Sequence, residues 1–153
     1  MKRKATTPPA GTGFRHILVP TDGTEFSAPA LGCAIRLAKL FRARLTGVHV
    51  VAPYARSATA LALLPGFRRS VRRQAQRALT AFRDEARSEG VRADAVTLVG
   101  SEPGQAILLA AQKHHCDLIV MASHGRGSLA GLLLGSETSK VLALSSIPVL
   151  VCR

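Results

Sequence analysis

The sequence has 153 residues, of which 47% are hydrophobic, and its formal net charge is +12. A chain of this length forms one domain that buries roughly 70% of its unfolded surface, so it needs neither a disulfide nor a metal to fold. The three cysteines lie at scattered positions, which excludes a zinc site of paired cysteines and favours reduced thiols in a cytoplasmic protein. No apolar run approaches the roughly 20 residues of a membrane span, so we expect no membrane association.

The positive charge could attract nucleic acid, anionic lipid or a polyanionic ligand. Aromatic residues make up only 4% of the chain and Trp is absent, so few side chains could stack on bases. Residues 1–13 combine a basic cluster with Pro and Gly and lack apolar periodicity. We expect them to form a disordered basic tail, followed by a single domain over residues 14–153.

Apolar runs alternate with amphipathic stretches along this domain. The runs expected to form strands lie at residues 17–19, 44–51, 95–99, 118–121 and 149–152. Helices are expected at residues 27–41, 67–88 and 137–144, and another opens at Ser101-Glu102-Pro103 with Ser101 as its cap candidate. This order implies right-handed crossovers and a doubly wound α/β fold, in which one parallel five-stranded sheet is covered on both faces.

Asp22 directly follows the first strand, at an edge of the sheet where α/β proteins bind ligands. Its carboxylate could accept hydrogen bonds from a ribose or from the amino group of adenine. It could equally cap a turn with Gly23 and Thr24. The residues alone leave both roles open.

The stretch from Met121 to Thr138 joins the fourth strand to the last helix. Its four glycines let the backbone approach a ligand, and the N–H groups at a helix start bind anions. Phosphate is therefore the expected ligand. The glycine spacing fits neither a P-loop, because Gly135-Ser136 lacks the lysine, nor the dinucleotide fingerprint, whose glycines lie closer together.

The same stretch resembles the G-x-x-G-x(9)-G-S/T loop of the universal stress protein family. Ala122 stands at the first glycine position, Gly125 at the second, and Gly135-Ser136 at the third after nine intervening residues. Segments 17–22 and 147–151 extend the resemblance, which covers about residues 15–153. Ala122 departs from the pattern, because its methyl group narrows the gap between the backbone and a ribose.

The resemblance implies a Rossmann-like sheet of order 3-2-1-4-5, an adenine nucleotide as ligand, and ATP, with or without Mg²⁺, as cofactor. It places adenine near Asp22 and Val50, ribose near Ala122 and Gly125, and the phosphates at the start of the last helix. The nucleotide-binding residues that we expect are Pro20, Thr21, Asp22, Val50, Met121, Ala122, His124, Gly125, Arg126, Gly135, Ser136, Glu137 and Thr138.

Individual residues of this set allow more than one role. Arg126 could contact a phosphate or remain a solvated loop residue, and His124 is expected to stabilise a turn. Glu137 is an acid in the first turn of the last helix, where it favours the helix but not a neighbouring phosphate. The family commonly dimerises through its terminal strand, which implies a homodimer through Val149, Leu150 and Val151.

No catalytic triad, paired carboxylates or metal cluster accompanies this site, so we expect a stress-response regulator with at most slow ATP hydrolysis. One alternative is a stress protein that binds no nucleotide and acts through its dimer and protein contacts. Another is a basic nucleic-acid-binding protein that uses the seven arginines between Arg68 and Arg87. A charged helix face is more often simply solvated, which disfavours this last reading.

Overall fold

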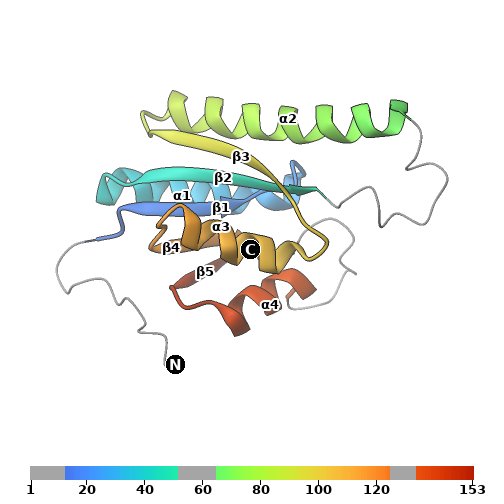
Figure 1. Ribbon diagram of the computed structural model, residues 1–153. Coiled ribbons are helices and arrows are strands. Elements are labelled where there is room, and N and C mark those ends of the chain that lie inside the picture. The colour runs from blue at the N-terminus through green and yellow to red at the C-terminus, as the bar shows by residue number, and fades with distance from the viewer. Residues whose placement is uncertain (1–12, 52–64, 125–133) are drawn as a thin grey trace.

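The computed structural model describes residues 13–51, 65–124 and 134–153. Five parallel strands form one sheet with the order β3-β2-β1-β4-β5, as Figure 1 shows. The strands are β1 (His16–Pro20), β2 (Arg44–Val51), β3 (Ala93–Val99), β4 (Leu118–Ala122) and β5 (Val149–Cys152). The predicted fold class and strand order are both confirmed.

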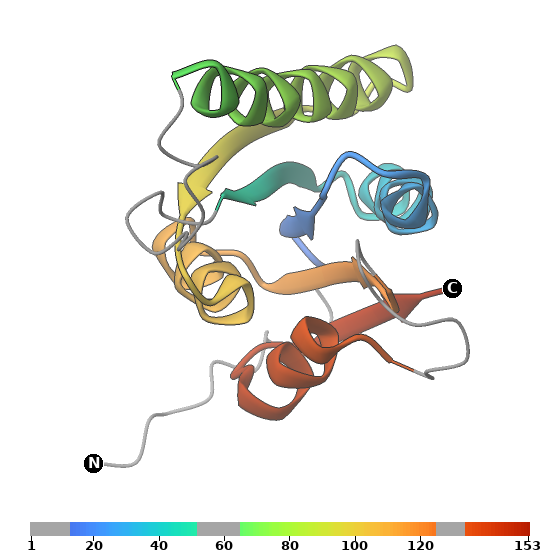
Figure 2. The same ribbon diagram turned by 90° about the vertical axis from the view of Figure 1, so that its right-hand side faces the viewer.

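Within the described residues, four α-helices and a short 3₁₀ helix connect the strands. They are η1 (Glu25–Ser27), α1 (Ala28–Phe41), α2 (Pro65–Ser88), α3 (Pro103–Lys113) and α4 (Ser136–Leu144). Helices α1 and α2 cover one face of the sheet, and α3 and α4 cover the other (Figure 2). None of the helices in the described ranges is both long and apolar enough to cross a membrane.

The starts of α2 and α3 differ from the sequence expectation, and those of α1 and α4 lie one residue from the expected position. Helix α2 begins at Pro65, two residues before the expected start. The predicted cap at Ser101 is wrong, because Glu102 is the residue that precedes α3, with φ −124° and ψ 95°. Pro103 occupies the first helical position, where its fixed φ suits the helix and its missing N–H leaves no donor to satisfy.

The core consists of two clusters, one on each face of the sheet. Alternate strand residues point to opposite faces, so that Ile17 packs under α1 and α2 while Leu18 packs under α3 and α4. Residues 17–19 and 119–120 are completely buried. This double coverage explains why the central strands read as continuous apolar runs.

Helix α2 approaches β2 closely at Gly47. An ideal Cβ at this glycine would lie 2.6 Å from Cδ1 of Phe82, which is closer than side chains pack. The ring of Phe82, only 2% exposed, therefore fills the space that a side chain at position 47 would take. This contact holds α2 against β2.

Most of the expected tail, residues 1–12, lies outside the described residues. Two expected nucleotide-binding residues, Gly125 and Arg126, also fall outside them. The tail and the contacts of these two residues stay predictions.

Candidate functional site

The turn after β1 is built by hydrogen bonds from its own residues. The Thr21 amide donates to the Val48 carbonyl at 2.9 Å, which ties the start of the turn to β2. The Asp22 carboxylate oxygen Oδ1 accepts the Thr24 amide at 2.9 Å and the Thr24 hydroxyl at 2.5 Å. The turn-capping role of Asp22 is thus confirmed, while its contact with a ligand stays a prediction.

Gly23, the next residue of the turn, lies against α2. Its φ of +74° is one that residues with side chains rarely adopt. An ideal Cβ at this position would lie only 2.7 Å from the Cβ of Ala78. The turn that carries Asp22 therefore depends on glycine for both its backbone conformation and its packing.

A second group of hydrogen bonds joins the end of β4 to the start of α4. The Ser123 amide donates to the Cys152 carbonyl at 2.7 Å, and the Ser123 carbonyl accepts the Gly135 amide at 2.7 Å. The Thr138 hydroxyl donates to the Ala122 carbonyl at 3.0 Å. These bonds hold the first turn of α4 directly at the end of β4.

The Asp22 turn and the start of α4 lie at the same edge of the sheet. Strands β1 and β4 are neighbours and run parallel, so that their carboxyl ends meet there. The 3₁₀ helix η1, which follows the turn, lies against β4. The structure thus brings together the two segments that sequence analysis assigned to one site.

Ala122 keeps a negative φ, because Arg42 and His115 are the only non-glycine residues of the described ranges with a positive one. Its side chain packs against the core cluster under α1, on the face opposite α4. Alanine in the first glycine position is therefore accommodated without backbone strain, and its methyl group points away from α4.

The Glu137 carboxylate is engaged with the start of α3, and its contact with a nucleotide stays a prediction. This carboxylate accepts the amide of Gly104 at 2.5 Å, within the first turn of α3. The same carboxylate lies 3.8 Å from the Lys140 ammonium group. An ideal Cβ at Gly104 would approach Glu137 to 3.0 Å, so glycine permits this contact between the helices. Sequence analysis missed this cap, because its two partners are 33 residues apart.

The other described site residues contribute in different ways. Met121 is 5% exposed and packs in the core, so that only its backbone can meet a ligand. The His124 ring nitrogen Nδ1 hydrogen-bonds with the Ser123 hydroxyl at 2.9 Å, which agrees with the expected turn-stabilising role. Pro20 and Val50 are half-buried, and Ser136 is exposed at the first position of α4.

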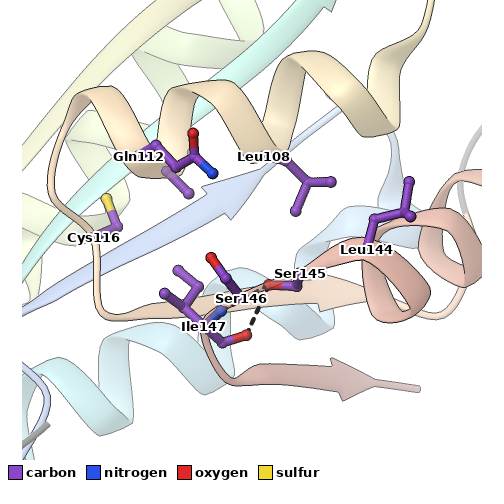
Figure 3. Close-up of a pocket in the computed structure, with 8 residues that line it drawn as sticks. Leu108, Gln112, Cys116, Leu144, Ser145, Ser146 and Ile147 are labelled. Carbon is purple, nitrogen blue, oxygen red and sulfur yellow. Dashed lines mark hydrogen bonds between the residues drawn. The ribbon is translucent and has the colours of Figure 1, made fainter. Parts of the chain in front are cut away.

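A small cavity lies away from this edge, between the C-terminal parts of α3 and α4 (Figure 3). Its volume is about 30 Å³, which suits a water molecule but no nucleotide. Cys116 lines it, and burial raises the pKa of the Cys116 thiol to about 12. This thiol is therefore protonated and unreactive at neutral pH.

The arginines of α2 line the surface of the molecule. Those that are exposed are Arg68, Arg69, Arg72, Arg73, Arg77 and Arg87, and Arg83 is half-buried. Their exposure agrees with a solvated helix face and also leaves the face accessible to a polyanion. Nucleic-acid binding at this face stays a prediction.

A sequence model described as the universal stress protein family matches residues 13–153 of the chain. The chain belongs to the universal stress protein family. It is 34% identical over 148 residues to the universal stress protein YxiE of Bacillus subtilis (strain 168), a match that covers 92% of this chain and 99% of that protein. The resemblance inferred from the glycine loop is thus confirmed for nearly the whole domain.

Solved structures of universal stress proteins share the fold. UspA from Lactobacillus plantarum superposes with a TM-score of 0.79 at 27% identity, covering 92% of this chain and 99% of that one. A universal stress protein in complex with cAMP superposes with a TM-score of 0.68 at 25% identity, covering 92% and 98% of the two chains. Nucleotide binding therefore occurs among the structural relatives of this chain.

Proposed function

We propose that this chain binds ATP at the carboxyl ends of β1 and β4 and acts as a cytoplasmic, nucleotide-dependent regulator of a stress response. The observation that carries the proposal is the bond from the Gly135 amide to the Ser123 carbonyl, which holds the start of α4 at the end of β4. A helix start attracts anions, because its first N–H groups have no partners within the helix. The cAMP complex of a related protein supports an adenine nucleotide as the ligand.

The ligand would contact the two segments described above. Adenine would lie near Asp22 and the backbone of Val50, and ribose near Ala122. The phosphates would meet the N–H groups at the start of α4 and the hydroxyl of Ser136, which is exposed. The hydroxyl hydrogen of Thr138 is already donated to the Ala122 carbonyl, so Thr138 would contribute through its backbone. ATP bound in this way would bring Mg²⁺ on its phosphates, and any hydrolysis would be slow.

Calorimetric titration with Mg-ATP at physiological salt tests the proposal, after a check that no nucleotide co-purifies with the protein. We expect saturable binding at one site per chain. Gly135→Val should weaken it, because the Cβ would be in van der Waals contact with the Ser123 carbonyl oxygen at 3.4 Å and the two methyl groups beyond it would crowd the start of α4. Gly66→Val is the matched control, since nothing lies within 4 Å of a Cβ at that position. Equal affinity in both variants would contradict the proposed site.

A pair of substitutions at Asp22 separates its role in the turn from a role in binding. Asp22→Asn keeps an oxygen acceptor for Thr24, whereas Asp22→Ala removes it. If the carboxylate accepts from the adenine amino group, both variants lose affinity for ATP, although Asp22→Asn should keep the stability of the parent. If only Asp22→Ala loses affinity, Asp22 supports the turn and does not bind the nucleotide.

The proposal includes a homodimer through the terminal strand. Strand β5 lies at an edge of the sheet, and Leu150 on this strand is 39% exposed. An exposed apolar edge strand is commonly covered by another chain. Leu150→Arg should convert the dimer to a monomer in light-scattering measurements. Leu109→Arg, at an exposed leucine on α3, is the control. A dimer that survives Leu150→Arg would rule out this interface.

A further inference from the structure

Two cysteines from distant parts of the sequence meet beside the core. Cys33 lies on α1 and Cys152 is the last residue of β5, and both are half-buried. Both side chains pack against the same core cluster, and α1 contacts β5. The Cys152 thiol interacts with the Cys33 side chain, and this interaction adds to the rise in the pKa of Cys152. The two sulfur atoms are thus neighbours on one face of the sheet and are accessible in part to solvent.

This thiol pair lies next to the site edge. Cys152 pairs in register with Ala122 of β4, and its carbonyl accepts the amide of Ser123. A hydrogen bond therefore links the C-terminal end of β5 to Ser123, and the Ser123 carbonyl in turn accepts the Gly135 amide at the start of α4.

We propose that Cys33 and Cys152 form a site of reversible thiol oxidation, at which glutathione disulfide converts the two thiols into an intramolecular disulfide that fastens α1 to β5. The Cys33 sulfur, as thiolate, attacks one sulfur of glutathione disulfide, which releases one glutathione thiolate and leaves a mixed disulfide on Cys33. The Cys152 sulfur then displaces the second glutathione, and each released thiolate takes up one of the two protons lost by the protein thiols. The protein loses two electrons and two protons, and one glutathione disulfide becomes two glutathione molecules.

The order of the two steps follows from the surroundings of the thiols. Burial, together with the interaction with Cys33, raises the pKa of the Cys152 thiol to about 11. Cys152 is therefore scarcely ionised at neutral pH and is a poor first nucleophile. Once Cys33 carries glutathione, the neighbouring Cys152 sulfur attacks within the molecule, where proximity raises its effective concentration. Reducing conditions oppose disulfides, so we expect the bond to form only under oxidative conditions.

The test is a redox titration of the purified full chain in glutathione buffers, followed by alkylation and mass spectrometry. The expected product at high glutathione disulfide has lost two hydrogen atoms, and its peptide map links Cys33 to Cys152 within one chain. Cys33→Ser and Cys152→Ser should each prevent this product. Cys116→Ser should form it as the parent does, because Cys116 lies in the cluster on the opposite face.

A stability measurement checks that the link joins folded elements. The disulfide closes a loop that spans most of the chain, so the oxidised protein should have a Tm about 5–10 °C above that of the reduced protein. The serine variants of Cys33 and Cys152 should show no such difference. The proposal is overturned if the parent keeps two free thiols in excess glutathione disulfide, if each thiol stops at a glutathione adduct, or if the link involves Cys116 or a second chain. These outcomes do not depend on nucleotide binding.

Discussion

Replacement of Glu137 by alanine should destabilise the protein without weakening its binding of ATP. In the fold, the Glu137 carboxylate accepts the Gly104 amide at the start of α3 and places a negative charge at that helix terminus. Alanine leaves the amide without this acceptor, and it also removes a like charge from the neighbourhood of the proposed phosphate position. The first effect lowers the free energy of unfolding, and the second acts on the affinity for ATP. Separate measurements of stability and of binding therefore distinguish the two effects.

The expected loss of stability can be estimated from these contacts. A hydrogen bond to a charged acceptor contributes about 1.5–3 kcal/mol when well buried. The Glu137 side chain is 37% exposed, so solvent screening reduces this figure, and we expect a loss of about 1–2 kcal/mol. Glu137→Gln keeps an acceptor and loses only the interaction of the charge with the helix dipole, about 0.3–1 kcal/mol. The Tm should fall by about 2–4 °C for each kcal/mol.

Urea denaturation of the parent and the two variants measures the change, and calorimetry with Mg-ATP measures the affinity. Lys140→Ala is the control for the ion pair, because Lys140 lies 3.8 Å from Glu137 and an exposed pair of this kind contributes little. We expect this control to remain within about 0.5 kcal/mol of the parent. A Glu137→Ala variant that keeps full stability but loses affinity for ATP would refute the capping role and make Glu137 a ligand contact.

Three further substitutions test other parts of the fold. Burial, followed by the charge of Arg44, lowers the pKa of His16 below 6.5, so the unfolded chain binds more protons and stability should fall as the pH drops through 6.5. His16→Gln should show a shallower fall in urea midpoints between pH 7 and pH 5, and an unchanged slope would exclude His16 as the cause. Gly47→Ala should cost about 1–3 kcal/mol in the same assay, because its Cβ collides with Phe82, and a neutral result would show that the ring can move. Ala122→Gly should leave ATP affinity within about twofold of the parent because its methyl group packs under α1, and a tenfold gain would place that group in the site.

The positions of the helices, strands and turns along the chain could be predicted from the sequence better than the contacts between elements that are far apart in it. Strand positions follow from short apolar runs, and the turn at Asp22 follows from the spacing of Asp22 and Thr24. Both the apolar runs and this spacing are local patterns. The order of the strands came from the resemblance to a family, because periodicity does not reveal which buried strands are neighbours.

The contacts that sequence analysis missed join residues far apart in the chain. The cap from Glu137 to Gly104 and the meeting of Cys33 with Cys152 depend on how two elements pack, which no local pattern encodes. Gly104 offered a weak signal, since a glycine just inside a helix start suggests that something approaches the backbone closely. The start of α3 was misplaced because Ser101 has the right side chain for a cap, yet the position of Pro103 decides where the helix begins.

The contact between Gly23 and Ala78 constrains how relatives of this protein can diverge. Arg69, Arg72 and Arg73 on α2 are exposed at the surface, so other side chains fit at these positions without a steric clash. Position 78 has no such freedom, because a larger residue there would push against Gly23 and distort the turn that carries Asp22. We therefore expect relatives that keep glycine at position 23 to keep a small residue at position 78, so that the two positions vary together while the helix around them changes its charge.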